Sequence, residues 1–197
     1  MKYNTQNLNK LFDSNNNWGI PNVLTPKVDI LPNKLIAYGN TKTKDQCYHF
    51  FIKDYKFEAL WSLNKNTLRS LKRQQVILAP VYNISADLPL VARIWNVYRS
   101  RWLTRLWQEN GINVIPTATW NDEESLKFAF EGLPVNSIIA ITVRDHTEES
   151  FKLGLEALIN KCNPKQLLIY GESSSPLFNV ALKMHSNVKI YTFNKLK

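Results

Sequence analysis

Arg144, Asp145 and His146 stand together in the chain and carry side chains that can do acid–base chemistry. A histidine that a neighbouring carboxylate orients is a common general base, because the pKa of its imidazole lies near neutral pH. The three residues directly follow an apolar run, Ile138–Val143. The alternative is that Asp145 or Thr147 caps the next helix and that His146 is an ordinary loop residue. Asp145 and His146 are therefore candidate catalytic residues, and both interpretations stay open.

A third acidic candidate, Glu172, directly follows the apolar run Leu167–Tyr170 in the segment GESSSP. Free backbone N–H groups at a helix start can bind an anion, but serine followed by proline is also a common helix start. We expect a strand-to-helix turn that a serine side chain caps, and we keep Glu172 as a candidate catalytic residue. Glycine-rich phosphate loops and the GxSxG nucleophile motif are absent from the sequence.

Trp120 is the candidate residue for stacking on a ligand. It follows the short apolar run Val114–Ile115 and precedes Asn121 and Asp122, which are both good helix caps. An aromatic side chain at the carboxyl end of a strand can stack on a ring-shaped ligand or on a nucleic-acid base. A purely structural role for Trp120 is the alternative.

Histidine and cysteine residues are too few and too scattered to predict a metal centre. His49, His146 and His185 show no metal-binding spacing, and Cys47 and Cys162 form no CxxC motif. We therefore expect no metal ion, no cofactor and no disulfide, and we expect two plain thiols.

The net charge of the chain is +9, from 25 lysines and arginines and 16 acidic residues. Such an excess attracts polyanions such as nucleic acid, and a merely solvated basic surface is the alternative. Two clusters of cations lie in helical segments, at residues 65–73 and 99–105. The residues that we predict to bind nucleic acid are Arg69, Lys72, Arg73, Arg99, Arg101 and Arg105.

The longest predicted helix, Pro89–Asn110, places arginines beside tryptophans. Its helical spacing predicts an apolar face toward the core, formed by Val91, Ile94, Trp95, Tyr98, Trp102 and Leu106. The opposite face then carries Arg93, Asn96, Ser100, Thr104 and Gln108. Arginine beside tryptophan is suited to binding phosphates and stacking on bases, whereas a core helix with snorkelling or paired arginines is the alternative.

The elements that must position these residues alternate along the chain. Short apolar runs predict six strands, at Leu35–Tyr38, Val76–Ala79, Val114–Ile115, Ile138–Val143, Leu167–Tyr170 and Val188–Phe193. Helical patterns predict helices at Tyr55–Leu71, Pro89–Asn110, Glu123–Phe130, Glu148–Lys161 and Pro176–Met184. This alternation predicts an α/β fold with a mostly parallel sheet of five or six strands flanked by helices. The sheet is either an open doubly wound sheet or a partial βα barrel.

Residues 1–33 are rich in asparagine and proline, and their apolar residues follow neither a helical nor a strand pattern. We expect them to form an irregular N-terminal arm, anchored by Trp18, Ile20 and Val23, on a single α/β domain of residues 34–197. The chain start lacks the apolar stretch of a signal peptide, and no apolar run reaches the roughly 18 residues of a membrane span. We therefore expect a cytoplasmic protein without membrane contact, in the host cytoplasm if a phage encodes it. The oligomeric state stays open.

Five segments form an ordered set: Phe50–Trp61, Ala86–Arg101, Trp107–Trp120, Phe128–Ser137 and Leu167–Gly171. Together they resemble an uncharacterised protein family of phages, prophages and plasmids, domain of unknown function 4417. The resemblance covers most of the chain after residue 20 and implies an α/β fold and a mobile-element context, but no reaction. Where the family has a Pro-Asp-Phe-Ser-like segment, this chain has Pro80-Val81-Tyr82-Asn83, so the acid is missing at that place.

These observations lead to three hypotheses about function. The first is a small basic protein of a phage or other mobile element that acts on or beside nucleic acid. The second is an anti-defence protein or other inhibitor that binds an acidic or nucleic-acid-binding host protein. The third is a small α/β enzyme with its site at the carboxyl ends of the strands, using Asp145, His146 or Glu172.

Overall fold

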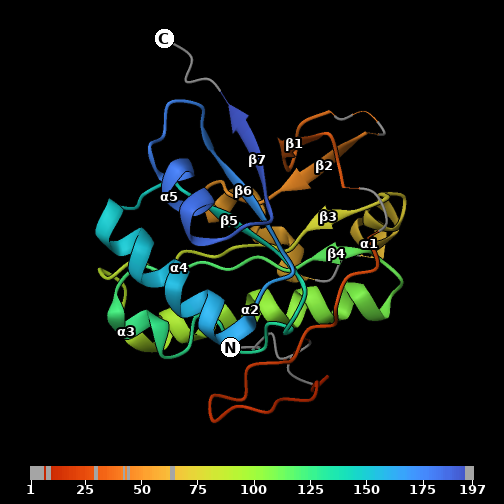
Figure 1. Cartoon of the computed structure of the whole chain (residues 1–197). Coiled ribbons are helices and arrows are strands. Elements are labelled where there is room, and N and C mark those ends of the chain that lie inside the picture. The colour runs from red at the N-terminus through yellow and green to blue at the C-terminus, as the bar shows by residue number, and fades with distance from the viewer. Residues whose placement is uncertain are drawn as a thin grey trace.

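The computed structural model describes residues 7, 10–28, 31–41, 43, 45–62 and 65–193. Within these residues the chain is an α/β protein with seven strands (Figure 1). The strands are β1 Lys34–Ala37, β2 Gln46–His49, β3 Ile77–Leu78, β4 Val114–Ile115, β5 Ile138–Thr142, β6 Gln166–Glu172 and β7 Val188–Phe193. The helices are α1 Lys65–Lys72, α2 Leu90–Glu109, α3 Glu123–Leu126, α4 Glu148–Cys162 and α5 Leu177–Met184, with short 3-10 helices η1 Asp54–Lys56 and η2 Glu58–Ser62. None of these helices has the length and apolar character that crossing a membrane requires.

All neighbouring strands are parallel, and their spatial order follows the chain. One sheet has the order β1-β2-β3-β4 and the other has the order β5-β6-β7. A parallel bridge between Thr117 and Ala140 joins the two sheets, and the backbone N–H of Ala118 donates to the carbonyl of Ala140 at 2.8 Å. Because the order never reverses, the arrangement is that of a partial βα barrel and not of a doubly wound sheet.

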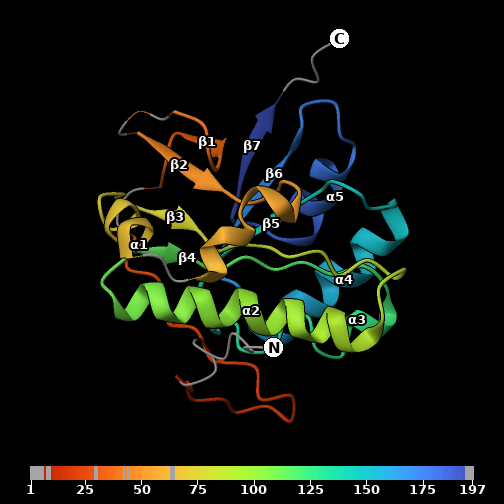
Figure 2. The same ribbon diagram turned by 180° about the vertical axis from the view of Figure 1, so that it is seen from behind.

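The barrel is open between β7 and β1, for which the described residues show no strand pairing. Side chains connect the two edges instead. The hydroxyl of Tyr191 and the Nζ of Lys189, both on β7, donate to the carbonyl of Pro32 at 2.8 and 3.0 Å. Pro32 lies two residues before β1, so the sheet curves enough to bring its first and last strands near each other (Figures 1 and 2).

The concave face of the curved sheet encloses one apolar cluster to which every strand contributes. Its members include Leu35, Cys47, Leu78, Ile115, Ala140, Leu168 and Tyr191. Side chains alternate along each strand, so the residues between these point outward beneath the helices. There α4 and α5 cover one cluster around Ile141 and Ile169, and α1 and α2 cover another around Ile77 and Val114.

The six predicted strands are confirmed, and β2 is a seventh strand that the sequence did not predict. The predicted helix Tyr55–Leu71 is wrong as one element, because η1, η2 and α1 divide that segment. The predicted helix Glu123–Phe130 is shortened to α3, which Asp122 caps by accepting a hydrogen bond from the N–H of Ser125. The serine cap expected for α5 is also wrong, since Pro176 occupies that position without a side-chain cap.

The helix α2 buries most of the face that we predicted to be polar, and it also buries Trp102 and Leu106 of the predicted apolar face. Its buried residues include Arg93, Asn96, Ser100 and Thr104, whereas Val91 is 74 % exposed and Trp95 is 37 % exposed. The buried donors bind backbone carbonyls of the loop after β3. Arg93 Nε binds Ile84, Asn96 Nδ2 binds Asn83 and the hydroxyl of Ser100 binds Pro80, at 3.1, 2.5 and 2.6 Å. The helix therefore faces loops that need hydrogen-bond donors, and not only apolar side chains.

Arg101 is a further buried donor on α2. Its guanidinium donates to the carbonyls of Thr117, Ala129 and Glu131 at 3.1, 2.8 and 3.0 Å, and the residue is 3 % exposed. Burial lowers the pKa of Arg101 to about 10, which leaves the side chain charged at neutral pH. A buried cation that satisfies three carbonyls binds α2 to the loops that follow β4 and α3.

His49 on β2 lies inside the curved sheet. Its ring stacks against Tyr170 and Phe51, with centroids 4.2 and 5.7 Å away, and its Nδ1 accepts a hydrogen bond from the N–H of Phe51 at 3.2 Å. Burial, with a smaller effect from the charge of Arg144, lowers the pKa of His49 to about 4. The imidazole is therefore neutral at physiological pH.

The N-terminal residues 10–28 contain no helix or strand and run along α2 (Figure 2). The Nε1 of Trp102 donates to the carbonyl of Lys10 at 2.9 Å, and Gln108 exchanges two hydrogen bonds of 2.8 Å with the backbone of Leu24. Ile20 and Val23 are buried in the body. Trp18 is 41 % exposed and makes an edge contact with Phe128.

We expect the substitution Arg101→Met to lower the free energy of unfolding by about 3–5 kcal/mol, because it leaves three buried carbonyls without a donor. Arg73→Met, at an exposed arginine after α1, is the matched control and should change it by no more than about 0.5 kcal/mol. Urea unfolding measures both. Equal midpoints for the two variants would contradict the structural role of Arg101.

We expect His49 to make stability depend on pH. Between about pH 6.5 and 4 the unfolded chain takes up a proton at His49 that the folded protein does not bind. The free energy of unfolding therefore falls as the pH falls through this window, by roughly 3 kcal/mol from this residue alone. Urea unfolding of His49→Gln at pH 7, 5.5 and 4.5 should lack this part of the loss, whereas His185→Gln should retain it. An unchanged pH dependence in His49→Gln would refute the assignment.

Candidate functional site

A cavity of about 700 Å³ opens at the carboxyl ends of β2, β3, β4 and β5. Its walls come from the loops that follow these four strands, within residues 50–55, 81–85, 119–121 and 142–146. Parallel βα folds bind their ligands at this edge, because the loops there are free to carry functional side chains. We refer to this space as the carboxyl-edge cavity.

Hydrogen bonds connect the first three of these loops. The backbone N–H of Asn83, after β3, donates to the carboxylate of Asp54, after β2, at 2.9 Å. The backbone N–H of Ala86 donates to Oδ1 of Asn121, after β4, at 3.1 Å. Each loop is therefore fixed to the next one along the sheet.

Two further contacts close the ring of loops. The rings of Trp120 and His146 stack with centroids 4.8 Å apart, which joins the loop after β4 to the loop after β5. Arg144 Nη1 donates to the carbonyl of Phe51 at 3.0 Å, which joins the last loop back to the first. The carboxyl-edge cavity is thus enclosed by a continuous series of contacts and is a built feature of the fold.

Trp120, the predicted stacking residue, lines this cavity and is held in place from behind. Its Nε1 donates to the carbonyl of Ser150 at 2.9 Å. A Cβ atom at Gly154 of α4 would lie 2.0 Å from that Nε1, so the indole requires glycine there. Trp120 is 4 % exposed, and only a small part of its ring can reach a ligand.

Asp145 and His146, two of the three predicted catalytic residues, also line the cavity. Burial lowers the pKa of His146 in spite of the nearby charge of Asp145, which keeps the imidazole neutral at pH 7. The backbone of Asp145 has a φ of 63°, a left-handed conformation that is uncommon for residues other than glycine. Strain of this kind is frequent at binding and catalytic sites.

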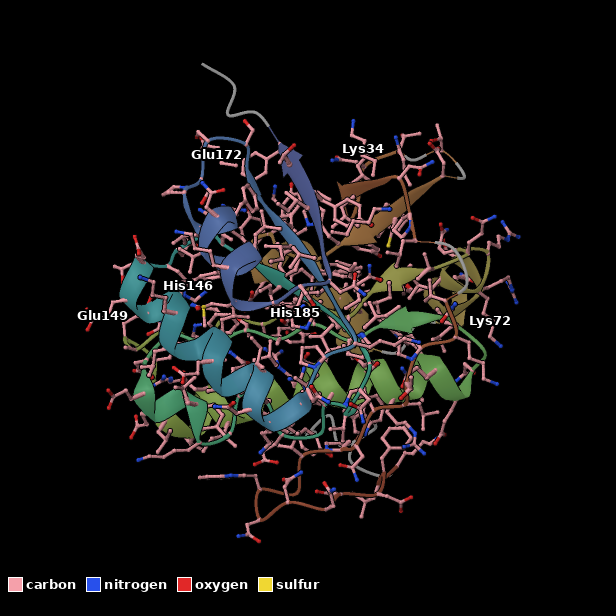
Figure 3. The ribbon with its side chains drawn as sticks, viewed as in Figure 1. Lys34, Lys72, His146, Glu149, Glu172 and His185 are labelled. Atoms are coloured by element: carbon pink, nitrogen blue, oxygen red, sulfur yellow. The ribbon has the colours of Figure 1, made fainter. Side chains whose placement is uncertain are left out.

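Glu172, the third predicted catalytic residue, lies at the end of β6 and is not among the residues that line the cavity. Figure 3 shows its side chain well apart from that of His146. The structure therefore brings Asp145 and His146 together and leaves Glu172 outside. Among the described residues, no three His, Cys, Asp or Glu side chains form a group that could hold a metal ion. Cys47 and Cys162 are buried free thiols.

Asp54 is a cavity residue that the sequence did not predict. Burial raises the pKa of its carboxyl, while the N–H of Asn83 and the nearby charge of Arg99 act in the opposite direction. A carboxyl with a raised pKa can exchange protons closer to neutral pH than an exposed aspartate can. The sequence analysis missed Asp54 because it did not predict β2. Without that strand, Asp54 is not recognised as a residue at a strand's carboxyl end.

Tyr82 lines the cavity, and Arg99, which does not, packs on its ring. The guanidinium of Arg99 lies over the ring of Tyr82 at 3.8 Å, and it pairs with Glu58 at 2.5 Å and with Asn96 at 2.7 Å. Burial raises the pKa of Tyr82. The hydroxyl of Tyr82 and the Nε of Arg99 are buried and have no hydrogen-bond partner among the described residues.

The three arginines of α2 that we predicted to bind nucleic acid have structural partners. Arg99 packs on Tyr82 and pairs with Glu58, and Arg101 is enclosed by carbonyls, so the prediction for Arg101 does not agree with its burial. Arg105 donates to the carbonyl of Asn22 at 2.9 Å and to Glu109 at 3.2 Å. The guanidinium groups of α2 are therefore occupied in holding the arm and the loops.

The predicted cations of α1 lie at the opposite edge of the sheet. Arg69, Lys72 and Arg73 are exposed and precede β3, which places them at the amino ends of the strands. None of the three forms an ion pair with a described residue. In Figure 3, Lys72 and Lys34 lie on the side of the molecule away from Glu149, which is on the first turn of α4.

A second hollow, of about 360 Å³, lies at this amino edge. Its walls include Lys27, Asn33 and Gln75, and also Asn113 directly before β4. Asp45 also lines the hollow, whereas Lys34 follows Asn33 and Arg73 is two residues before Gln75, so several cations and one acid lie around it. We refer to Lys27, Lys34, Arg69, Lys72 and Arg73 as the amino-edge cations.

Comparison with known proteins agrees with the resemblance in the sequence. The family model described as "Domain of unknown function (DUF4417)" matches residues 12–187. The chain is 36 % identical over 182 residues to the "Gene 1 protein" of Mycobacterium phage L5, which covers 87 % of the chain and 79 % of that relative. It is 33 % identical over 181 residues to the "Gene 1 protein" of Mycobacterium phage D29, which covers 86 % of the chain and 66 % of that relative. No solved structure matches the chain. The family match over most of the chain confirms the expected resemblance, and the protein belongs to the DUF4417 family.

Proposed function

We propose that this protein acts for a phage or related mobile element by binding nucleic acid with its amino-edge cations. The observation that supports the proposal most directly is the exposed group Arg69, Lys72 and Arg73. These three lie at the end of α1 without an ion pair to any described residue. Cations that no carboxylate neutralises attract the phosphates of a polyanion most strongly.

The direction of the helices also favours cations at the amino edge. In a βα unit the helix begins at the carboxyl edge and ends at the amino edge, and the helix dipole favours acids at its start and cations at its end. The helix α4 begins with Glu148 and Glu149, and α1 has Arg69 and Lys72 in its last turn. The end of α1 therefore carries cations that can attract a polyanion.

Lys27 and Lys34 extend the cationic surface beyond α1. Lys27 lines the 360 Å³ hollow, and Lys34 begins β1 next to Asn33, which lines the same hollow. Asn33 and Gln75 also line this space, whereas the amide of Asn113 is bonded to the backbone of Lys27. Amide and ammonium groups together are suited to contacting a sugar-phosphate backbone, which carries no sequence information by itself.

We expect salt to weaken binding of a labelled DNA or RNA oligonucleotide, with a slope that reports the number of neutralised phosphates. The triple variant Arg69→Gln/Lys72→Gln/Arg73→Gln should bind a DNA duplex roughly tenfold or more weakly at 50 mM salt. Its log–log salt slope should be smaller by about 2 to 3, at about 0.9 per lost phosphate contact. Fluorescence anisotropy at several salt concentrations measures both quantities.

The matched control is Lys56→Gln/Lys127→Gln/Lys152→Gln, which removes the same charge at exposed positions away from the amino edge. It should retain nearly the full affinity and slope, and the thermal melting of both triple variants should confirm that they fold. Equal losses in the two triple variants would show that net charge and not this surface attracts the polyanion. Undetectable binding of the unsubstituted protein at low salt would refute the proposal.

A further inference from the structure

The carboxyl-edge cavity has the size and enclosure of a ligand site. Its volume of about 700 Å³ lies within the roughly 300–1,000 Å³ of small-molecule pockets. The ring of contacts through Asp54–Asn83, Ala86–Asn121, Trp120–His146 and Arg144–Phe51 surrounds it on all four loops. The α2 donors hold the loop after β3 from behind. The cavity therefore exists before any ligand enters, which reduces the entropy cost of binding.

Aromatic side chains in the cavity offer flat apolar surface to a ring. Tyr55 follows β2, lines the cavity and is 72 % exposed, so its ring is accessible at the entrance. The His146 imidazole is half-buried and stacks on Trp120, which fixes its orientation. A planar heterocycle can stack on such surfaces, as bases do on aromatic side chains in nucleic-acid complexes.

Polar side chains around the same space have unused hydrogen-bonding capacity. The side-chain oxygens of Asn83 and Asn121 accept from the backbone N–H groups of Ser85 and Ala86, at 2.9 and 3.1 Å. Their Nδ2 groups have no acceptor among the described residues. One oxygen of the Asp54 carboxylate accepts from the N–H of Asn83. Donors beside an acceptor match the edge of a nucleobase, which carries both.

Two cations in the cavity can bind an anionic group. Lys53 is exposed and lines the cavity, and no described residue binds its ammonium group. Arg144 is exposed and gives one nitrogen to the carbonyl of Phe51, which leaves its other donors unused. Asp54 and Asp145 bring two negative charges to the same walls. Two cations balanced by two carboxylates accommodate one phosphate better than a chain of three phosphates.

We propose that the carboxyl-edge cavity binds a nucleoside monophosphate, with the base among Tyr55, His146 and the two asparagine amides and the phosphate on Lys53 and Arg144. The nucleotide comes either as a free molecule or as the phosphorylated end of a nucleic-acid strand, since both present the same group. The proposal does not depend on the amino-edge cations, which lie at the opposite ends of the strands.

The proposal is tested by saturation-transfer NMR and calorimetry with the purified full chain. The ligands are the common ribonucleoside 5′-monophosphates and the common deoxyribonucleoside 5′-monophosphates, each measured separately. At least one should bind with a Kd below about 1 mM, and its nucleoside without phosphate should bind at least tenfold more weakly. Lys53→Gln should weaken the monophosphate about tenfold and leave the nucleoside unchanged. Lys53 has no described side-chain partner, so this variant tests phosphate contact without loosening the loops. Arg144→Gln should weaken the monophosphate further.

Two controls separate this proposal from the binding of nucleic acid at the amino edge. The triple α1 variant Arg69→Gln/Lys72→Gln/Arg73→Gln should bind the monophosphate normally, and so should Lys127→Gln. A 5′-phosphorylated tetranucleotide that binds more tightly than the free monophosphate, with the same sensitivity to Lys53→Gln, identifies a strand end as the ligand. Tighter binding of the free monophosphate identifies a free nucleotide. The absence of binding by all monophosphates at millimolar concentration, or equal binding by wild type and Lys53→Gln, would overturn the proposal.

Discussion

The hydrogen bonds between the polar face of α2 and backbone carbonyls are the interaction on which the rest of the structure depends. Arg93, Asn96 and Ser100 lie on successive turns of one helix and bind the carbonyls of the loop 80–84. Loop carbonyls have no strand partner, and each one left buried without a donor costs about 1–3 kcal/mol. The helix supplies these donors, so an irregular loop can lie against the core at the carboxyl edge.

The same helix determines the shape of the carboxyl-edge cavity. Arg101 binds the carbonyls of Thr117 and Ala129, which lie beyond β4 and beyond α3. One rigid element therefore holds the loops on two sides of the cavity, and their separation is set by the spacing of donors along α2. Apolar packing alone is non-directional and would fix these loops less closely. The cavity is therefore preformed because directional hydrogen bonds from α2 hold the loops that enclose it.

The sequence predicted the strands well because they are short apolar runs covered on both faces. It missed β2, whose inward side chains Cys47 and His49 alternate with half-exposed polar or aromatic ones. It did not predict that the polar face of α2 is buried, because periodicity assumes that a buried face is apolar and carries no information about carbonyls that need hydrogen-bond donors. The partners of Arg101 lie 16 to 30 residues away and are known only from the fold. Asp145 and His146 could be predicted because they follow a predicted strand. Asp54 could not be predicted, because β2, the strand before it, was missed.

The division of charge between the two edges of the sheet follows from the direction of the helices. Acids at the carboxyl edge find local partners, as Asp122 and Glu124 do in Arg93 and as Glu148 does in Lys152. Arg69, Lys72 and Arg73, at the end of α1, form no ion pair with a described residue. Because potentials of exposed charges decay over about 8–10 Å at physiological salt, a large polyanion responds to the amino edge, whereas a ligand with one phosphate responds to the few cations inside the cavity.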